Sequence, residues 1–177
     1  PELVLRLTML LHDIGKPFVW GECFEGNDCF PEHELPSAEI AAEFLERLHY
    51  DRKTSKEVIK LILAHNDHLL PEDYNIRLEL NKMGADSLRR LLKVKCADMS
   101  AKNAAMQEMV GFFEKIARQT EEIIARGDCY TLSQLAINGS DLRELGYEGR
   151  RIGELLEYAL AEVLKDPALN EKERLLV

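Results

Sequence analysis

Apolar residues recur at intervals of three and four along most of the chain, and no stretch alternates cleanly between apolar and polar residues. An interval of three to four residues places side chains on one face of an α-helix, whereas a half-buried strand needs alternation. The longest periodic stretch predicts a helix over residues 104–126 that ends at Gly127. Another is predicted over residues 150–165, ended by Pro167. The fold is therefore expected to be all-α, with about eight helices.

Polar residues mark where several of these helices begin. Thr54 and Glu57 have the spacing of a capping box, in which two side chains bond backbone N–H groups at a helix start. Asp86 follows the end of a short helix, over about residues 76–83, and is the expected N-cap of a longer one. A further helix begins at His33, and its expected buried stripe is Ile40, Ala41, Phe44, Leu45 and Leu48.

Size and charge limit the kinds of function that the chain can have. A chain of 177 residues, 46% of them hydrophobic, can bury a real core, which argues against disorder. The net charge of -9 argues against a general polyanion binder. Any RNA contact must therefore come from a local patch of basic residues. The alternative interpretation of such a patch is a helix face that is simply exposed to solvent. The most basic helix carries Arg89, Arg90, Lys95 and Lys102.

Two absences in the sequence bear on its location. No apolar run approaches the roughly 20 residues of a membrane-spanning helix, so no membrane contact is expected. The four cysteines include no C-x-x-C pair, and we expect them to be reduced thiols. The sequence therefore predicts a cytoplasmic protein.

One octet, Leu10-Leu11-His12-Asp13-Ile14-Gly15-Lys16-Pro17, carries the clearest chemistry. An apolar helix ends there, because a glycine and a proline stop it. Neighbouring helical residues point about 100° apart, so His12 and Asp13 can reach one point only near a helix end. A metal ion bound there would have an open side for substrate, with the cation of Lys16 at its rim. Taken alone, a His-Asp pair at a helix end is also consistent with simple capping.

The octet resembles the signature of the HD superfamily of metal-dependent phosphohydrolases. The resemblance covers about residues 3–102 and implies an all-helical domain that binds one or two divalent metal ions. The superfamily's distant aspartate matches Asp98, and its histidines for a second metal match His33 and His65. The implied metal ligands are thus His12, Asp13, His33, His65 and Asp98.

The same resemblance implies roles for these residues. Asp13 would be catalytic, and Lys16 would hold a non-bridging phosphate oxygen. The metal, one of Mn, Fe, Co, Ni, Zn or Mg, would activate water and neutralise charge on the phosphorus. Members also carry a histidine upstream of the His-Asp pair, and no histidine precedes His12 here. We therefore expect that ligand in sequence before Pro1.

Residues 18–32 are expected to form a loop, because glycine, asparagine and proline interrupt any period there. Two interpretations of the loop remain open. Its aromatic side chains fold onto the core, or the loop is a lid over the substrate, since long loops are often functional. The aromatic residues concentrated in it are Phe18, Trp20, Phe24 and Phe30.

The last part of the chain changes character. Thr131 and Gln134 form a second capping box, glycines separate short helices, and Asn170 is expected to cap the final helix. One interpretation of this region is phosphate binding, because the free backbone N–H groups at helix starts suit phosphate. The alternative is a plain helical hairpin in which glycines end the helices. The pattern resembles the carboxy-terminal region of bacterial tRNA nucleotidyltransferases, the CCA-adding enzymes and their poly(A) polymerase relatives. The residues that carry this resemblance are 135–142, 145–146, 151–153, Asn170 and 175–176.

Together the two resemblances predict an HD domain over residues 1–127 and a tRNA nucleotidyltransferase-type helical region over 128–177. The strand-rich nucleotidyltransferase head is expected only in a full-length chain. The leading hypothesis is a phosphohydrolase for nucleotide phosphomonoesters or 2′,3′-cyclic phosphates that also recognises tRNA or an RNA 3′ end. Arg150 and Arg151 are the candidate RNA contacts of the second region. The alternatives are a catalytically silent tRNA-binding module and a stand-alone HD hydrolase of small nucleotides.

Overall fold

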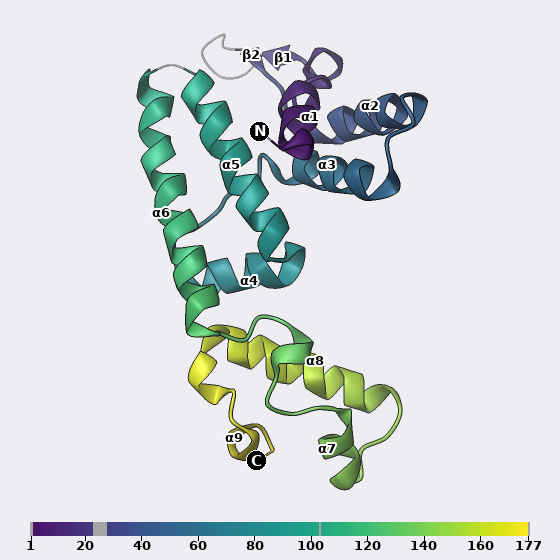
Figure 1. Ribbon diagram of the computed structural model, residues 1–177, viewed down its shortest axis with the longest axis vertical. Helices are drawn as coiled ribbons and strands as arrows, with labels where there is room; N and C mark the ends of the chain where they lie inside the picture. The colour runs from purple at the N-terminus through teal and green to yellow at the C-terminus, as the bar shows by residue number, and fades with distance from the viewer. Residues whose placement is uncertain (1, 23–27, 103, 177) are drawn as a thin grey trace. The chain divides into compact units, whose positions relative to one another are not determined.

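The computed structural model describes residues 2–22, 28–102 and 104–176, and it is predominantly α-helical, as predicted (Figure 1). The only β structure in these ranges is a two-residue ladder that pairs Gly21 with Cys29. In chain order the elements are α1 Leu3–Leu11, η1 Lys16–Phe18, β1 Gly21–Glu22, β2 Asp28–Cys29, α2 Glu34–Arg47, α3 Arg52–Ala64, α4 Asp73–Met83, α5 Ala85–Ala101, α6 Ala104–Arg126, η3 Leu132–Gln134, α7 Gly139–Glu144, α8 Arg150–Lys165, η4 Pro167–Leu169 and α9 Lys172–Leu175, where η denotes a 3₁₀ turn.

The chain divides into two compact units. The first comprises Pro1–His68 with Asp86–Glu114, and the second comprises Leu69–Ala85 with Lys115–Val177. Each unit combines segments that are separated in the sequence, whereas the predicted domains, 1–127 and 128–177, are continuous ranges. The units therefore do not test the predicted domain boundaries. Among the described residues, none of the helices is both long and apolar enough to cross a bilayer.

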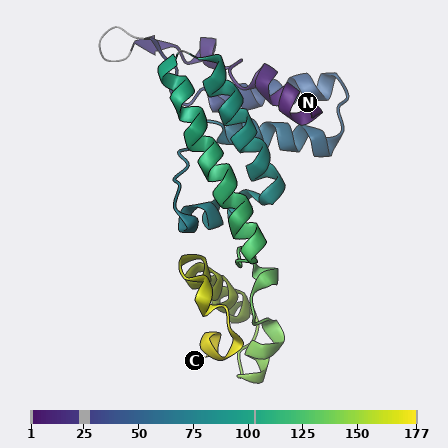
Figure 2. The same ribbon diagram turned by 60° about the vertical axis from the view of Figure 1, so that its left-hand side comes forward.

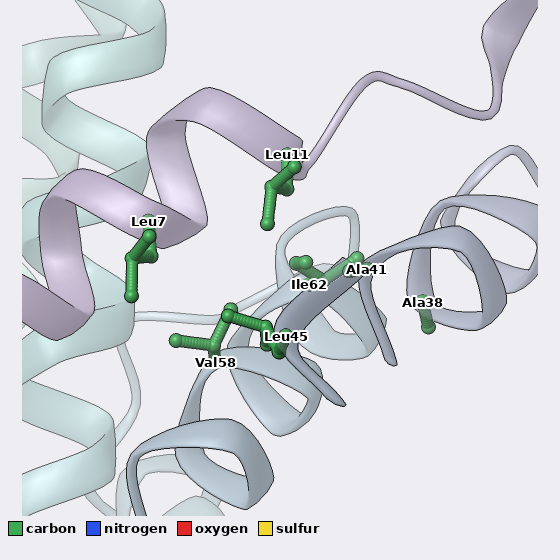
Figure 3. Packing of buried hydrophobic residues seen from close by; sticks show 7 residues of the cluster. All are labelled: Leu7, Leu11, Ala38, Ala41, Leu45, Val58 and Ile62. Atoms are coloured by element: carbon green, nitrogen blue, oxygen red, sulfur yellow. The ribbon is translucent and has the colours of Figure 1, made fainter. Parts of the chain in front are cut away.

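The core of the first unit is built where α1, α2 and α3 pack together (Figure 3). Small residues on α2 let the other two helices approach closely. The predicted stripe of α2 is only partly right, because Phe44 and Leu48 are exposed and the buried face begins one turn earlier, at Ser37. Leu11 is buried directly before His12, so core packing fixes the end of α1 at which the site begins. The cluster consists of Leu7, Leu11, Ala38, Ala41, Leu45, Val58 and Ile62.

Capping places the start of α3. The carboxylate of Asp51 accepts hydrogen bonds from the backbone N–H groups of Lys53 and Thr54, at 3.0 and 2.9 Å, so Asp51 and not Thr54 is the N-cap of α3. A cap at Asp51 satisfies two N–H groups that have no partner within the helix. Helix α5 begins at Ala85, so Asp86 lies inside its first turn and is not its N-cap, contrary to the prediction.

Within the first unit, α5 and the part of α6 up to Glu114 lie side by side (Figures 1 and 2). The ammonium of Lys95 on α5 lies 5.4 Å from the ring centroid of Phe113 on α6. Lys95 is buried, which is rare for a lysine unless its charge is matched. Its other partners belong to the site and are described below.

The second unit is organised by a buried arginine of α4. Arg77 donates hydrogen bonds from Nε to the carbonyl oxygen of Leu164 (2.8 Å) and from Nη2 to that of Lys165 (3.2 Å), which are the last two residues of α8. It also pairs with Asp128 at 3.1 Å. These bonds satisfy carbonyl groups that a helix end leaves without partners, and so join α4 to α8.

Asn170 has a different role from the predicted one. Its side chain accepts a hydrogen bond from the backbone N–H of Ala136 (2.8 Å) and donates one to the carbonyl oxygen of Gln134 (3.0 Å). The N-cap of α9 is instead Glu171. Asn170 therefore joins the segment before α9 to the segment that follows η3, two parts of the chain far apart in sequence.

Candidate metal centre

Three histidines of the first unit come from the ends of three different helices. His12 follows the last residue of α1, His33 directly precedes α2, and His65 follows the last residue of α3. All three are buried. Because helix ends meet there, residues 12, 33 and 65 reach one place despite their separation in sequence.

Each histidine is held in the same way. The Nδ1 atom of each ring lies within hydrogen-bond distance of the carbonyl oxygen three residues earlier, at 3.0 Å for His12, 2.8 Å for His33 and 2.6 Å for His65. A carbonyl oxygen can only accept, so Nδ1 carries the proton and Nε2 of the neutral ring has a lone pair. This arrangement is typical of histidines that bind a metal ion through Nε2. The accepting residues are Met9, Phe30 and Ile62.

The Nε2 atoms point toward one another. Those of His33 and His65 lie 3.1 Å apart, and the His12 and His65 ring centroids are 5.1 Å apart. The Nε2 atom of His12 is buried and makes no hydrogen bond to any described residue. Lone pairs that face one another without a donor are unfavourable unless a cation lies between them. The residues present therefore fit a divalent metal ion.

Two carboxylates join the histidines. Asp13 places Oδ1 3.2 Å from Nε2 of His33 and 3.9 Å from that of His65, and Oδ2 3.5 Å from that of His12. Asp98 of α5 places Oδ1 3.7 Å from Nε2 of His12. Ligand atoms of His12, Asp13 and His65 lie within 4.8 Å of one another, which is close enough to share an ion.

The electrostatics favour a site of ionised carboxylates beside a neutral imidazole. The contact with His12 lowers the pKa of Asp98, and the Lys102 ammonium adds to this against the effect of burial. Burial raises the pKa of Asp13, but the contact with Lys16 and the nearby histidines outweigh it, so the net pKa is lowered. Burial lowers the pKa of His65. Metal ligands must be deprotonated, so these three groups are poised for binding.

His12 differs from the other site residues. Burial opposes its protonation, but the contact with Asp98 and the charge of Asp13 outweigh burial and raise its pKa. In the absence of a cation, the two carboxylates therefore attract a proton to His12. A divalent ion would replace that proton as their counter-charge.

A lysine lies against each carboxylate. Lys16 contacts Oδ2 of Asp13 at 2.5 Å, and Lys102 contacts Oδ2 of Asp98 at 2.6 Å. The predicted phosphate ligand Lys16 is thus beside the predicted catalytic residue. Lys102, a predicted RNA contact, is here a partner of Asp98.

The structure places Lys95 inside the protein. Its ammonium donates hydrogen bonds to the carbonyl oxygens of His65 and Asp67, at 2.7 and 2.6 Å. A buried ammonium is not available to RNA, so the interpretation of Lys95 as an RNA contact is corrected. Its contacts instead fix the turn that carries His65.

The other predicted RNA contacts lie on the surface in ion pairs. Arg90 pairs with Glu2 and Glu57, and Arg89 pairs with Asp86. In the second unit the two arginines at the start of α8 both pair with Glu154. These two residues are Arg150, whose side chain is 93% exposed, and Arg151, whose side chain is also exposed.

Sequence reasoning missed a close approach beside the site. The backbone N–H of Gly15 donates to Oγ of Ser37 at 2.9 Å, and a Cβ at Gly15 would lie 2.4 Å from the backbone nitrogen of Ser37 and 2.7 Å from the carbonyl oxygen of His33. Only glycine fits this position. The signal was a glycine two residues after Asp13, although its partner lies 22 residues away.

Two interpretations that involve the loop after the octet do not hold throughout. Phe18 and Trp20 are exposed and do not fold onto the core, Phe30 is half-buried, and Phe24 lies outside the described residues. Cys29 is disulfide-bonded and not a reduced thiol, whereas Cys96 and Cys129 are free. A disulfide requires two thiols whose Cα and Cβ atoms lie close enough in the fold, which the spacing of cysteines in the sequence does not reveal.

The chain is similar to proteins of known family. In an alignment of 164 positions that covers 91% of the chain, it is 28% identical to the A-adding tRNA nucleotidyltransferase of Deinococcus radiodurans. It spans 37% of the length of that relative. No solved structure matches it. The family model of the HD domain matches residues 1–100, which is more than half of the chain, and the chain therefore belongs to the HD domain family.

Proposed function

We propose that the chain is a metal-dependent phosphohydrolase that forms the carboxy-terminal part of a tRNA nucleotidyltransferase-family protein. Its substrates would be nucleotide phosphomonoesters or 2′,3′-cyclic phosphates, free or at an RNA end, and its location the cytoplasm. One observation carries the proposal. Three histidine Nε2 atoms and two carboxylates converge, with every Nδ1 held by a carbonyl oxygen.

We propose two sets of ligands among these residues. His12, Asp13 and Asp98 would hold one ion, and His33 with His65 would hold a second ion or the substrate phosphate. A bound divalent ion, whether Mn, Fe, Co, Ni, Zn or Mg, supplies Lewis acidity that acidifies water and neutralises charge on the phosphate.

The protein's own groups would orient the reaction. The backbone carbonyls fix the imidazole rings, so the ligands need little rearrangement when substrate arrives. The ammonium of Lys16 already lies beside Asp13. We propose that it leaves Asp13 for a non-bridging phosphate oxygen, which places a positive charge where negative charge is held in the transition state.

Hydrolysis of bis(p-nitrophenyl) phosphate with added Mn, Co or Ni tests this function. Asp13→Ala should abolish turnover while the circular dichroism spectrum stays that of the parent chain. The matched control is His68→Ala, because His68 is an exposed histidine three residues from His65. Turnover in Asp13→Ala equal to that of the parent would exclude the assignment.

A second candidate function, holding tRNA without hydrolysis, has its own support. The similarity to the A-adding enzyme extends over 91% of the chain and therefore well beyond the HD match. Arg150 and Arg151 are exposed at the start of α8, where a phosphate would be favoured.

Binding of tRNA as a function of salt tests this second function. Phosphate contacts release counterions, so affinity should fall steeply as salt rises. Replacing both Arg150 and Arg151 by glutamate should weaken binding and flatten the salt dependence. Arg52→Glu is the control, because Arg52 is an exposed arginine at the start of another helix. Affinity that does not depend on salt would count against tRNA binding, and a short native reading frame would favour the stand-alone hydrolase.

A further inference from the structure

Two exposed aromatic side chains lie on the segment that leaves the metal centre. Phe18 is 73% exposed and Trp20 is 57% exposed. Burying a large apolar side chain is worth about 1.5–3 kcal/mol, so exposing two of them within three residues gives up a real gain in stability. Exposed aromatic rings are also the side chains on which nucleic-acid bases stack.

Contacts with the centre anchor both ends of this segment. At its start, the backbone N–H of Phe18 donates to the carbonyl oxygen of Gly15 at 3.0 Å, within the octet that carries His12 and Asp13. At its return, the carbonyl oxygen of Phe30 accepts from Nδ1 of His33 at 2.8 Å. The segment that carries the aromatic residues therefore begins beside the octet and returns to His33 of the site.

The cation Lys16 connects the aromatic segment to the reacting end of the site. Its ammonium contacts Asp13 and also lies 5.5 Å from the ring centroid of Phe30. Phe18 is two residues further along, so its Cα is at most about 7 Å from that of Lys16. The proposed phosphate ligand and an exposed aromatic residue are thus close neighbours along the chain.

Trp20 is held in a defined orientation. Its indole Nε1 donates to Oδ1 of Asp28 at 2.8 Å, across the short ladder in which Gly21 pairs with Cys29. The polar edge of the ring is therefore used within the protein. What it offers to a ligand is the face of the ring, which suits stacking.

We propose that Phe18 and Trp20 form a stacking platform for the nucleobase of the substrate. The inference rests on the proposed phosphohydrolase function and narrows it, because the site would select phosphoesters that carry a base. Lys16 and the centre take the phosphate end, and the aromatic rings take the base end. Every nucleobase has a π face, so such a platform tolerates different bases.

Intrinsic fluorescence tests the platform without depending on turnover. Trp20 is the only tryptophan of the chain, so its emission reports on this position alone. With Mg²⁺ present, adenosine 5′-monophosphate should quench the emission in a saturable manner, whereas ribose 5-phosphate should leave it unchanged. An unchanged emission with adenosine monophosphate, or equal quenching by both compounds, would overturn the proposal.

Variant kinetics give a second test that separates the platform from the catalytic site. In the double variant Phe18→Ala with Trp20→Ala, kcat/KM for 2′,3′-cyclic adenosine monophosphate should fall roughly 10- to 100-fold. Hydrolysis of glycerol phosphate, which has no base, should keep the kcat/KM of the parent chain. Tyr158→Ala is the control, because this exposed tyrosine belongs to the other unit.

The outcomes of the kinetic test are distinct. A loss confined to the nucleotide supports stacking, and equal losses on both substrates would show that the aromatic pair only maintains the fold. Absence of all hydrolysis in the parent chain contradicts the proposed function, and the fluorescence titration then still decides whether a base binds at Trp20.

Discussion

The Nε2 atoms of His33 and His65 lie 3.1 Å apart, although both rings direct Nδ1 toward backbone carbonyl oxygens. With both Nδ1 atoms protonated, two neutral rings bring two lone pairs face to face. A second proton on one ring would relieve this repulsion, but burial lowers the pKa of His65. A divalent cation resolves the conflict, and several consequences can be measured.

Metal ions should stabilise the fold. A ligand that binds only the native state at a free concentration of 100 times its Kd contributes about 2.7 kcal/mol. For a chain of this size, that corresponds to an increase in Tm of roughly 5–10 °C. Thermal unfolding with added Mn²⁺ should show this increase, and a chelator should reverse it.

Two histidine variants test whether the stabilising ion binds at this site. His65→Ala removes one of the two facing nitrogens and should lose most of the metal-dependent increase in Tm. His68→Ala should keep it. The same increase in both variants would mean that the ion stabilises the protein from another place.

The position of Gly15 should not accept a side chain. The Cβ of Gly15→Ala would lie 2.4 Å from the backbone nitrogen of Ser37, so α2 would have to shift together with His33. We expect a loss of about 1–3 kcal/mol in the free energy of unfolding. Urea denaturation checks the stability, and hydrolysis should fall as well.

Gly111 offers the matched control for this substitution. It lies in α6 with open space around the position of its Cβ. Because alanine is the better helix former, Gly111→Ala should stabilise the protein by roughly 0.5–1 kcal/mol. Equal stability changes in the two variants would contradict the steric account of Gly15.

Lys95 should support the site rather than bind RNA. Lys95→Met keeps the apolar stem but removes the donor to the carbonyl oxygens of His65 and Asp67. We expect a loss of about 1–3 kcal/mol in stability and weaker metal binding. Calorimetric titration with Mn²⁺ measures the second effect.

Lys93→Met is the matched control, because it removes the same charge from the same helix at a different position. Lys93 lies on the same helix but is exposed. Its replacement should change neither stability nor metal affinity. Reduced tRNA binding in Lys95→Met, with metal affinity intact, would restore the original interpretation of this residue.

Acid should weaken the second unit through Asp128. Hydrogen bonding to Arg126 lowers the pKa of this carboxyl below its ordinary 3.8, and Arg77 adds to this against the effect of burial. A lowered pKa contributes stability that is complete above the unfolded-state value and is lost as the pH falls through the native value. The parent chain should therefore lose free energy of unfolding below about pH 4.

Asp128→Asn removes this titration. The variant should be less stable at neutral pH, and the difference from the parent should shrink as the pH falls. Urea unfolding at several pH values measures it. A difference that stays constant down to the most acidic pH would rule out Asp128 as a source of the acid sensitivity.

The long helices could be predicted from sequence because their signals are local. Helix α6 occupies residues 104–126 and α8 occupies residues 150–165, as predicted, since a glycine and a proline mark their ends. The start of α3 was misplaced, because Asp51 and Thr54 are both good caps only three residues apart. The exposed Phe44 shows that an apolar residue at helical spacing need not face the core.

The site depended on the family resemblance. Spacing alone could not bring His12, His33, His65 and Asp98 together, because their meeting depends on how the helices of the first unit pack. The bonds from the rings to backbone carbonyls were not predicted either, although each spans only three residues. The inward direction of Lys95 was missed because its burial depends on the packing of α5.

Metal content tests the central claim most directly. The purified chain would be loaded with Mn²⁺, desalted and measured by elemental analysis beside Asp13→Ala and His68→Ala. The account predicts one or two ions per chain in the parent and in His68→Ala, and none in Asp13→Ala. A parent chain that retains no ion, or an Asp13→Ala variant that retains as much as the parent, would contradict it.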